Sequence, residues 1–490
     1  MAEARNVVVI MSDEHDPRIM GCSGHPFIRT PNLDALAARG VRFANAYTPC
    51  PICVPARAAF ATGQRVHRIG HWDNAMPYVG THRGWGHVLQ ERGLRVESIG
   101  KLHYRNAEDP VGFDAEHLPM HVAGGHGMVW ASIRDPFRPR SDGQRMLGEH
   151  IGPGESSYTQ YDRAVTERAV QWLADAARQA DRPFMLYVGL VAPHFPLVAP
   201  PQFYELYPTD RLPEPKLLPG SGYRRHPWVQ QYADFFATEE RFVDADERLR
   251  AFAAYYGLCS WLDHNVGAIL AALQSSGLAE CTHVIYTSDH GDNLGARGVW
   301  GKATMYEESV RVPMLLAGPG VASSVCTTPV DLLDLFPTIL QGMGVDPATE
   351  MADRPGRSLF ELARSAPEPE RPIFSEYHAA GSNSAAYLLR QGRWKYHHYV
   401  GFRPELFDLE TDPEETVDLA GKPEFAATLE QMHGRLCAIC DPVAVDRQAK
   451  ADQEALIARH GGPDAAHLLG SSTSTPVPTA IETTHQEIHA

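Results

Sequence analysis

The sequence lacks a hydrophobic run long enough to cross a membrane, and basic residues are scarce relative to acidic ones. It has 490 residues, of which 60 are acidic and 44 basic, giving a formal net charge of −16. Such a surface repels nucleic acid and anionic lipid, so neither is an expected partner. The apolar run 6–11 near the N-terminus is too short for export or membrane spanning, which predicts a cytoplasmic protein.

Cysteines are also few, and their positions do not resemble a disulfide framework. The eight are scattered, which in a chain of this size favours packing roles. Cys50/Cys53 and Cys437/Cys440 nevertheless have CxxC spacing, as zinc-binding and redox-active cysteine pairs do. A non-catalytic zinc- or redox-binding protein is therefore one alternative.

Apolar, β-branched runs alternate with helical patterns over the first two thirds of the chain. Expected strands cover 6–11, 95–99, 183–191, 283–287 and 312–317, and expected helices cover 31–39, 83–92, 159–179, 249–276 and 330–343. Strands separated by helices predict an α/β fold with a large, mostly parallel sheet sandwiched by helices. In such sheets, ligands bind beyond the carboxyl ends of the strands.

The pattern changes near residue 371. Runs 373–377, 386–390 and 393–399 predict antiparallel strands, and the segment 405–409 and a helix over 423–440 follow them. We therefore expect a catalytic domain over 1–370 and a smaller C-terminal α+β subdomain over 371–469. Residues 470–490 are rich in Ser, Thr and Pro, which predicts a flexible tail.

Carboxylates and imidazoles follow two of the expected strands. Asp13 and Glu14 come after the first strand, and Asp289 and His290 after the fourth. A single Asp there is more often a helix cap or turn residue. Two such groups, each at the end of an expected strand, instead favour a hard divalent cation such as Ca²⁺, Mg²⁺ or Mn²⁺.

Cys53 lies at the start of an expected helix, with Pro55 in its first turn and Arg57 one turn along. A helix N-terminus favours a bound anion, so this cysteine is a candidate nucleophile; the alternative is a buried cysteine before a proline-initiated helix. Candidate polar side chains also occur in other segments, although an isolated Lys or His is usually solvated or packed. They are Lys101, His103, His194 and Lys302.

Taken together, these segments resemble the sulfatases of the alkaline-phosphatase superfamily. Cys53-Val54-Pro55-Ala56-Arg57 resembles the family signature, and the remaining matches span roughly residues 6 to 420 in the family's order. They are Gly100-Lys101-Leu102-His103, Pro193-His194-Phe195-Pro196, Asp289-His290-Gly291-Asp292, Gly301-Lys302 and Leu406-Phe407-Asp408. Within the family, Ala56 before Arg57 and Asp73-Asn74-Ala75 look most like choline-sulfatases.

The resemblance implies a sulfatase that hydrolyses a small-molecule sulfate ester to an alcohol and sulfate. It implies that a formylglycine-generating enzyme oxidises Cys53 to formylglycine. It also implies one divalent metal ion, Ca²⁺ before Mg²⁺ or Mn²⁺, bound by the modified Cys53 together with Asp13, Glu14, Asp289 and His290. Glu14 departs from the family, where this position is more often Asp or an amide.

The resemblance also implies roles for the remaining polar groups. Arg57 would hold the hydrated aldehyde, and Lys101 and Lys302 would neutralise charge on the sulfuryl oxygens. His194 donates a proton to the leaving oxygen, and His103 accepts the remaining hydroxyl proton.

The substrate is less well defined by the sequence. A phosphonate monoester or phosphodiester hydrolase of the same superfamily is the rival, but such relatives tend to carry neutral hydroxyl residues where Lys101 and His103 stand. A choline-like cation needs an aromatic or acidic cage, for which Trp130, Glu376 and Tyr377 are candidates. We therefore expect an aryl or other organic sulfate ahead of choline sulfate. The oligomeric state stays open, and in a homo-oligomer the tail from residue 470 could reach a neighbouring subunit.

Overall fold

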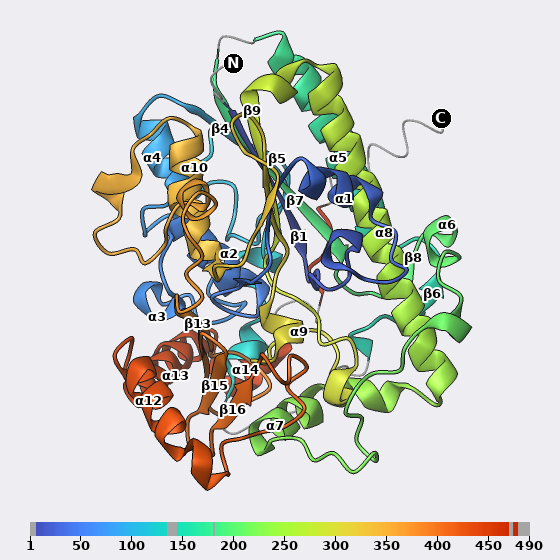
Figure 1. Cartoon of the computed structure of the whole chain (residues 1–490), viewed down its shortest axis with the longest axis vertical. Helices are drawn as coiled ribbons and strands as arrows, with labels where there is room; N and C mark the ends of the chain where they lie inside the picture. Colours follow the sequence, from blue (N-terminus) through green and yellow to red (C-terminus); the bar gives the residue numbers. More distant parts are fainter. Residues whose placement is uncertain (1–5, 135–144, 180–181, 470–473, 479–490) are drawn as a thin grey trace.

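The computed structural model describes residues 6–134, 145–179, 182–469 and 474–478. Its centre is an eight-stranded sheet with the order β11-β2-β10-β9-β1-β7-β4-β5 (Figure 1). The strands that bear on the site are β1 (Asn6–Asp13), β4 (Arg95–Lys101), β7 (Phe184–Pro193) and β9 (Thr282–Ser288). All the pairings among these four strands are parallel, so their carboxyl ends meet at one edge.

Strand β1 is buried on both faces because it lies in the middle of the sheet. Val7 and Val9 belong to one apolar core, and Val8 and Ile10 belong to the other. Helices cover both faces, as Figure 1 shows. One face carries α1 (Pro31–Ala38), α5 (Ser157–Ala177) and α8 (Ala245–Ser275), and the other carries α2 (Cys53–Thr62), α4 (Trp85–Glu91) and α10 (Leu335–Gly342).

This architecture confirms the predicted α/β fold with a large, mostly parallel sheet between helices. One departure is β10 (Met314–Ala317), which runs antiparallel to both β9 and β2. A second is the helix expected over 330–343, where α10 starts only at Leu335. Before it, the chain forms the short strand β12 (Val330–Asp331), and the Asp331 carboxylate caps a short 3-10 turn by accepting a hydrogen bond from the Leu333 N–H.

The C-terminal part forms a separate antiparallel sheet of β13 (Ile373–Tyr377), β14 (Ala386–Gln391), β15 (Trp394–Tyr399) and β16 (Glu405–Asp408). The predicted α+β character is therefore confirmed, whereas the boundaries at 370 and 469 stay predictions. Helix α12 (Ala426–Cys437) occupies most of the range expected to be helical. It is followed by α13 (Pro442–Arg459) and α14 (Pro463–Leu468), which the sequence analysis did not anticipate.

The remaining helices and strands are short. They are β2 (Gly40–Phe43), β3 (Ala46–Tyr47), α3 (Val66–Ile69), β5 (Ala115–Met120), β6 (Gly152–Pro153), β8 (Val198–Ala199), α6 (Pro201–Tyr204), α7 (Pro227–Phe236), α9 (Glu307–Val310), β11 (Ser324–Cys326) and α11 (Leu359–Leu362). Of these, β2, β5 and β11 belong to the eight-stranded sheet, and the others lie outside the two main sheets.

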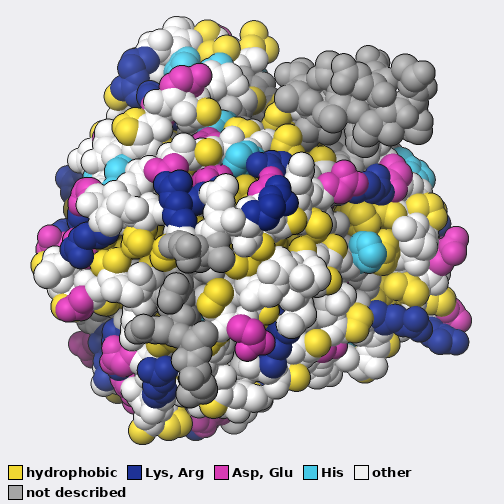
Figure 2. All heavy atoms as spheres, turned by 90° about the horizontal axis from the view of Figure 1, so that it is seen from above, with side chains coloured by type: hydrophobic (Ala, Val, Ile, Leu, Met, Phe, Trp, Pro, Cys, Tyr) yellow, Lys and Arg dark blue, Asp and Glu magenta, His cyan; other side chains and the backbone are white. Residues whose placement is uncertain are grey.

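Of the predicted flexible tail, residues 470–473 and 479–490 lie outside the described part of the chain. Residues 474–478 are described, and Thr475 among them is buried. Within the described residues, no helix has both the length and the apolar composition that crossing a membrane requires. Acidic and basic side chains are interspersed on the face drawn in Figure 2.

Candidate active site

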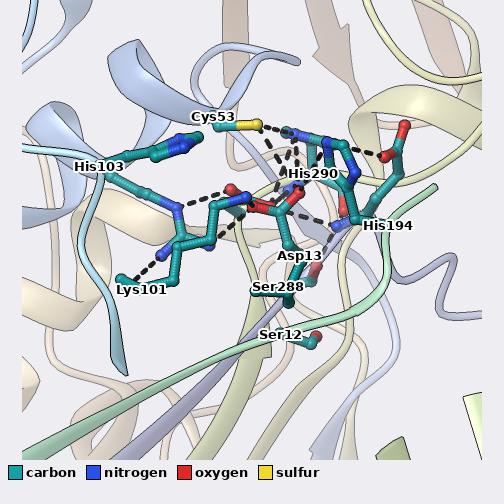
Figure 3. A network of polar contacts seen from close by, with 12 residues as sticks. Ser12, Asp13, Cys53, Lys101, His103, His194, Ser288 and His290 are labelled. Carbon is teal, nitrogen blue, oxygen red and sulfur yellow. Dashed lines mark hydrogen bonds and ion pairs between the residues drawn. The ribbon is translucent and has the colours of Figure 1, made fainter. Parts of the chain in front are cut away.

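The candidate site lies where the parallel strands end. Asp13 is the last residue of β1 and Lys101 the last of β4, while His194 follows β7 and Asp289 follows β9. Because β1 lies between β9 and β7, and β4 pairs with β7, these four side chains are brought to one edge of the sheet. Figure 3 shows Lys101 and His194 on either side of Asp13.

Cys53 is the first residue of α2, and it faces this edge. It is 1% exposed, and every other residue of α2 is buried too. The Asn74 side-chain oxygen accepts a hydrogen bond from the Val54 N–H and so satisfies one of the free donors at the helix start. Burial, followed by the negative charge of Asp13, raises the pKa of the Cys53 thiol to about 12.

The Cys53 sulfur is surrounded by polar groups from other elements. It lies 3.2 Å from His290 Nε2, 3.1 Å from Lys302 Nζ and 3.6 Å from Asp13 Oδ1. Lys302 lies 249 positions from Cys53 in the sequence, and the fold brings the two together.

A cluster of metal-type ligand atoms surrounds the same sulfur. One atom each of Asp13, Cys53, Asp289 and His290 lies within 4.8 Å of the others, and all four residues are buried. The Asp289 carboxylate is oriented by the Glu14 and His290 N–H groups, at 3.3 and 3.0 Å. Buried, preoriented oxygen and nitrogen donors of this kind fit a divalent cation.

Glu14, the fifth predicted ligand, belongs to a second group with Asp13 and His194. Its Oε2 lies 3.4 Å from Lys302 Nζ and 3.5 Å from His194 Nε2, while its buried Oε1 has no hydrogen-bond partner. Burial raises the pKa of Glu14 to about 8. This unpartnered carboxylate oxygen is available to a cation, which adds to the fit of the site.

Three residues at the site have left-handed backbone conformations that side chains disfavour. They are Glu14 with φ 70°, His103 with φ 56° and Ala303, next to Lys302, with φ 78°. Residues held in such sparsely populated conformations cluster at functional sites, where the surrounding structure must stabilise them.

Arg57 reaches the two central carboxylates. Its Nε donates to Asp289 Oδ2 at 2.8 Å and its Nη2 to Asp13 Oδ2 at 3.0 Å. Its Nη1 donates to the Lys101 carbonyl at 2.9 Å and to the Tyr187 hydroxyl at 2.8 Å. The guanidinium, which is 1% exposed, therefore fixes the ends of β1, β4 and β9 relative to α2.

Two lysines bring positive charge to the same place. Lys101 Nζ lies 2.7 Å from Asp13 Oδ2, and Lys302 Nζ lies 3.8 Å from Asp13 Oδ1. Burial alone would raise the pKa of Asp13, but the charges of Lys101 and Lys302 are foremost among those that hold it well below its usual value. Asp13 is therefore an anion in a cluster of cations, which suits an anionic substrate.

The two candidate histidines lie on different sides of Asp13. His194 Nδ1 lies 2.5 Å from the Phe195 carbonyl and, as the donor to it, leaves Nε2 facing Glu14 and, at 3.9 Å, Asp13. His103 follows β4, and Figure 3 shows its ring turned toward the side where Cys53 lies. His103 Nε2 is 2.9 Å from the Thr475 hydroxyl.

Two groups of residues that contact the site are not among those predicted from the sequence. The Tyr187 hydroxyl accepts a hydrogen bond from Arg57. Its position inside the apolar run 183–191 could have indicated this, because a buried tyrosine hydroxyl needs a hydrogen-bond partner. Tyr158 and Thr475 approach His194 and His103, and the low-complexity sequence around Thr475 offered no signal.

The structure does not favour the cysteine-pair alternative. All eight cysteines are free, and no metal-type cluster among the described residues includes Cys50, Cys437 or Cys440. Two candidate cage residues are also engaged elsewhere. Glu376 accepts hydrogen bonds from the His67 N–H and His378, and the Tyr377 hydroxyl donates to the Ala380 carbonyl.

Fold and site together define an α/β protein in which a helix-terminal cysteine lies beside a cluster of metal-type ligands at the end of a mostly parallel sheet. Comparison with known families narrows this class. The model of the Sulfatase family matches residues 5–345, and that of the N-sulphoglucosamine sulphohydrolase C-terminal region matches residues 295–441. The chain belongs to the sulfatase family and is a sulfuric ester hydrolase, which confirms the predicted family and reaction.

Curated relatives agree with this assignment. A choline-sulfatase of Rhizobium meliloti (strain 1021) is 33% identical over 91% of this chain and 89% of its own length. Human arylsulfatase K is 31% identical over 88% of this chain and 82% of its own.

Solved structures share the fold. They include a 2-O GAG sulfatase with a TM-score of 0.68 and 24% identity, covering 89% of this chain and 92% of that one. The phosphonate monoester hydrolase of Agrobacterium radiobacter has a TM-score of 0.70 and 22% identity, over 91% and 96%. At such identity the likeness concerns the fold alone, and it does not favour the phosphonate hydrolase alternative.

Proposed function

We propose that this chain hydrolyses the sulfate ester of a small organic alcohol or phenol, with Cys53 converted to formylglycine and one divalent cation, Ca²⁺ before Mg²⁺ or Mn²⁺. The observation that carries the proposal is the buried cluster of Asp13, Asp289 and His290 around the Cys53 sulfur. Sulfatases generally use a metal ion and formylglycine. The donor set found here suits both.

The ligands proposed for the cation are the four clustered residues, joined by Glu14 through its unpartnered oxygen. When present, the cation supplies Lewis-acid stabilisation of a sulfate oxygen, and the oxidised Cys53 supplies an oxygen nucleophile after hydration. Arg57 acts by orienting Asp13 and Asp289, with which its hydrogen bonds are made.

Substrate binding and proton movement fall to the remaining side chains. Lys101 and Lys302 bind the anionic sulfuryl group and neutralise charge as the ester bond breaks. His194 Nδ1 donates to the Phe195 carbonyl, so donation from Nε2 to the leaving oxygen requires the doubly protonated imidazolium, which returns to the neutral Nδ1–H form after the transfer. His103 accepts the hydroxyl proton in the step that releases sulfate.

The burial of Cys53 bears on its modification. Since Cys53 is 1% exposed and lies in a helix without an exposed residue, a formylglycine-generating enzyme must reach it before α2 packs. This enzyme is thus proposed as a transient partner of the unfolded chain.

Mass spectrometry of one peptide tests the modification. Trypsin releases residues 43–57, which contain Cys50 and Cys53 and end at Arg57. Fragment ions are expected to place an aldehyde at Cys53 and an unchanged thiol at Cys50, which serves as the internal control. A disulfide between the two cysteines, or a thiol at both in active enzyme, would refute the proposed nucleophile.

Comparing substrates tests the reaction. Turnover of nitrophenyl sulfate is expected to exceed that of a phenyl phosphonate ester, because Lys101 and His103 suit a sulfate. Choline sulfate is measured alongside, since one relative is named for it. A preference for the phosphonate would refute the sulfate ester assignment.

A further inference from the structure

The C-terminal segment 474–478 lies against the candidate site. Thr475 is 6% exposed, and its side chain and backbone contact two different elements. Its hydroxyl lies 2.9 Å from His103 Nε2, and its carbonyl accepts a hydrogen bond from the Tyr158 hydroxyl at 2.7 Å. Val477 packs against the main apolar core. The segment is thus fixed by polar and apolar contacts together.

Both contacts of Thr475 lead to candidate catalytic histidines. The first is made with His103 itself. The second is made with Tyr158, a residue of α5 whose ring meets the edge of His194 at a centroid distance of 5.8 Å. One residue of the C-terminal segment therefore links the surroundings of the two imidazoles.

The hydrogen bond also defines how His103 is held. With Nε2 engaged by the Thr475 hydroxyl, Nδ1 is buried and has no hydrogen-bond partner. An unpartnered buried nitrogen is costly unless another group uses it. Nδ1 is thus the ring nitrogen left for a proton from the reacting group, while Nε2 anchors the ring.

We propose that residues 474–478 form the wall of the active site beside His103, and that Thr475 is a positioning residue that orients the His103 imidazole. The segment closes the site on this side and limits the size of the alcohol part of the ester. The kinetic part of this proposal rests on the proposed sulfatase reaction, whereas the enclosure of His103 does not.

Four variants separate the hydroxyl from the segment that carries it. Thr475→Val keeps the shape and removes the hydroxyl, and Thr475→Ser keeps the hydroxyl. A truncation after Leu469 removes the whole segment, and a truncation after Pro478 is the matched control that leaves it in place. Each is assayed with a small and a bulky sulfate ester.

Loss of one neutral hydrogen bond predicts that Thr475→Val lowers kcat about five- to tenfold with KM little changed. Thr475→Ser is expected to restore kcat to within about threefold of the parent, because the bond to His103 is retained. Truncation after Leu469 is expected to raise KM for the small ester. It is also expected to raise the ratio of kcat/KM for the bulky ester to kcat/KM for the small one. The control truncation should match the parent enzyme.

A chemical readout tests the enclosure without any turnover. Diethyl pyrocarbonate modifies accessible histidines, and His103 is 3% exposed. Peptide mapping is expected to find His103 protected in the parent and in the control truncation, and modified after truncation at Leu469. His226, which is 1% exposed, serves as the internal reference for a fold that stays intact.

Two results would overturn the proposal. One is unchanged His103 reactivity and unchanged kinetics after truncation at Leu469. The other is a rise in kcat/KM for every ester after that truncation, which would identify the segment as an obstruction. If no variant or parent hydrolyses a sulfate ester but His103 becomes reactive on truncation, the reaction fails and the enclosure stands.

Discussion

Replacing Arg57 with Lys provides a quantitative test of how the site is held together. The guanidinium makes four hydrogen bonds, two of them to the carboxylates of Asp13 and Asp289. A lysine side chain keeps the positive charge, but its ammonium group is compact and its side chain is shorter than that of arginine. It therefore cannot hydrogen-bond to both carboxylates and the Lys101 carbonyl at once.

The expected loss follows from the bonds that are broken. A hydrogen bond to a charged group contributes about 1.5–3 kcal/mol, so losing one such bond and one neutral bond predicts that Arg57→Lys lowers the free energy of unfolding by about 2–4 kcal/mol. Tyr187→Phe removes only the hydroxyl partner and should cost about 1–2 kcal/mol. Arg163→Lys is the matched control, because Arg163 and Glu155 form an exposed pair for which about 0–1 kcal/mol is expected.

Urea unfolding, followed by tryptophan fluorescence with a chelator present, measures all three variants in the absence of metal. The predicted order of destabilisation is Arg57→Lys, then Tyr187→Phe, then Arg163→Lys. If Arg57→Lys unfolds at the same urea concentration as Arg163→Lys, the guanidinium does not hold the strand ends together and the reasoning fails.

Other predictions concern the nucleophile, the pH response and the sheet. Cys53→Ala is expected to abolish turnover without changing the melting temperature by more than a few degrees, and any retained activity would exclude Cys53 as the nucleophile. Burial opposes ionisation of Glu97, but hydrogen bonds led by that of His117 lower its pKa to about 2. The ionised Glu97 carboxylate therefore stabilises the fold fully above about pH 4.5, and this stabilisation is lost as the pH falls toward 2. Glu97→Gln should lower the free energy of unfolding by about 1–2 kcal/mol at pH 7, a value reduced to allow for solvent screening. Urea titrations at several pH values should show the difference between variant and parent disappearing in acid. A Cβ at Gly189 would lie 2.2 Å from the Lys101 carbonyl. Gly189→Ala should therefore lower the free energy of unfolding by about 1–3 kcal/mol and reduce activity. An unchanged melting temperature by calorimetry would show that β4 and β7 can move apart to accept the methyl group.

Much of the sheet was predictable because strand and helix signals alternate regularly. The strands containing Val8 and Ile285 are short apolar runs, and polar residues mark where they end. Parallel neighbours bring their carboxyl ends together, so the clustering of Asp13 with Asp289 followed from the fold class. The direction of β10 did not follow, because it depends on the path of the preceding loop.

Other parts depend on contacts that no local pattern encodes. Thr475 lies in a stretch of Ser, Thr and Pro without periodicity, and its burial comes from partners more than 300 residues earlier in the sequence. The predicted role of Arg57 toward the nucleophile stays a prediction, and two of its four hydrogen bonds are with carboxylates that only the folded sheet brings near. Which side of a helix faces which strand end is decided by tertiary packing.

The complete burial of α2 places two requirements on the same ten residues. Under the proposed modification of Cys53, this stretch of the unfolded chain would have to be recognised as a linear peptide by the oxidising enzyme. In the folded chain, it has to fill a fixed volume with no side chain free to vary. Ala56, for example, is fully buried, and a serine there would bring a hydroxyl into the core. Sequence changes that improve modification are therefore limited by packing, and changes that improve packing are limited by recognition.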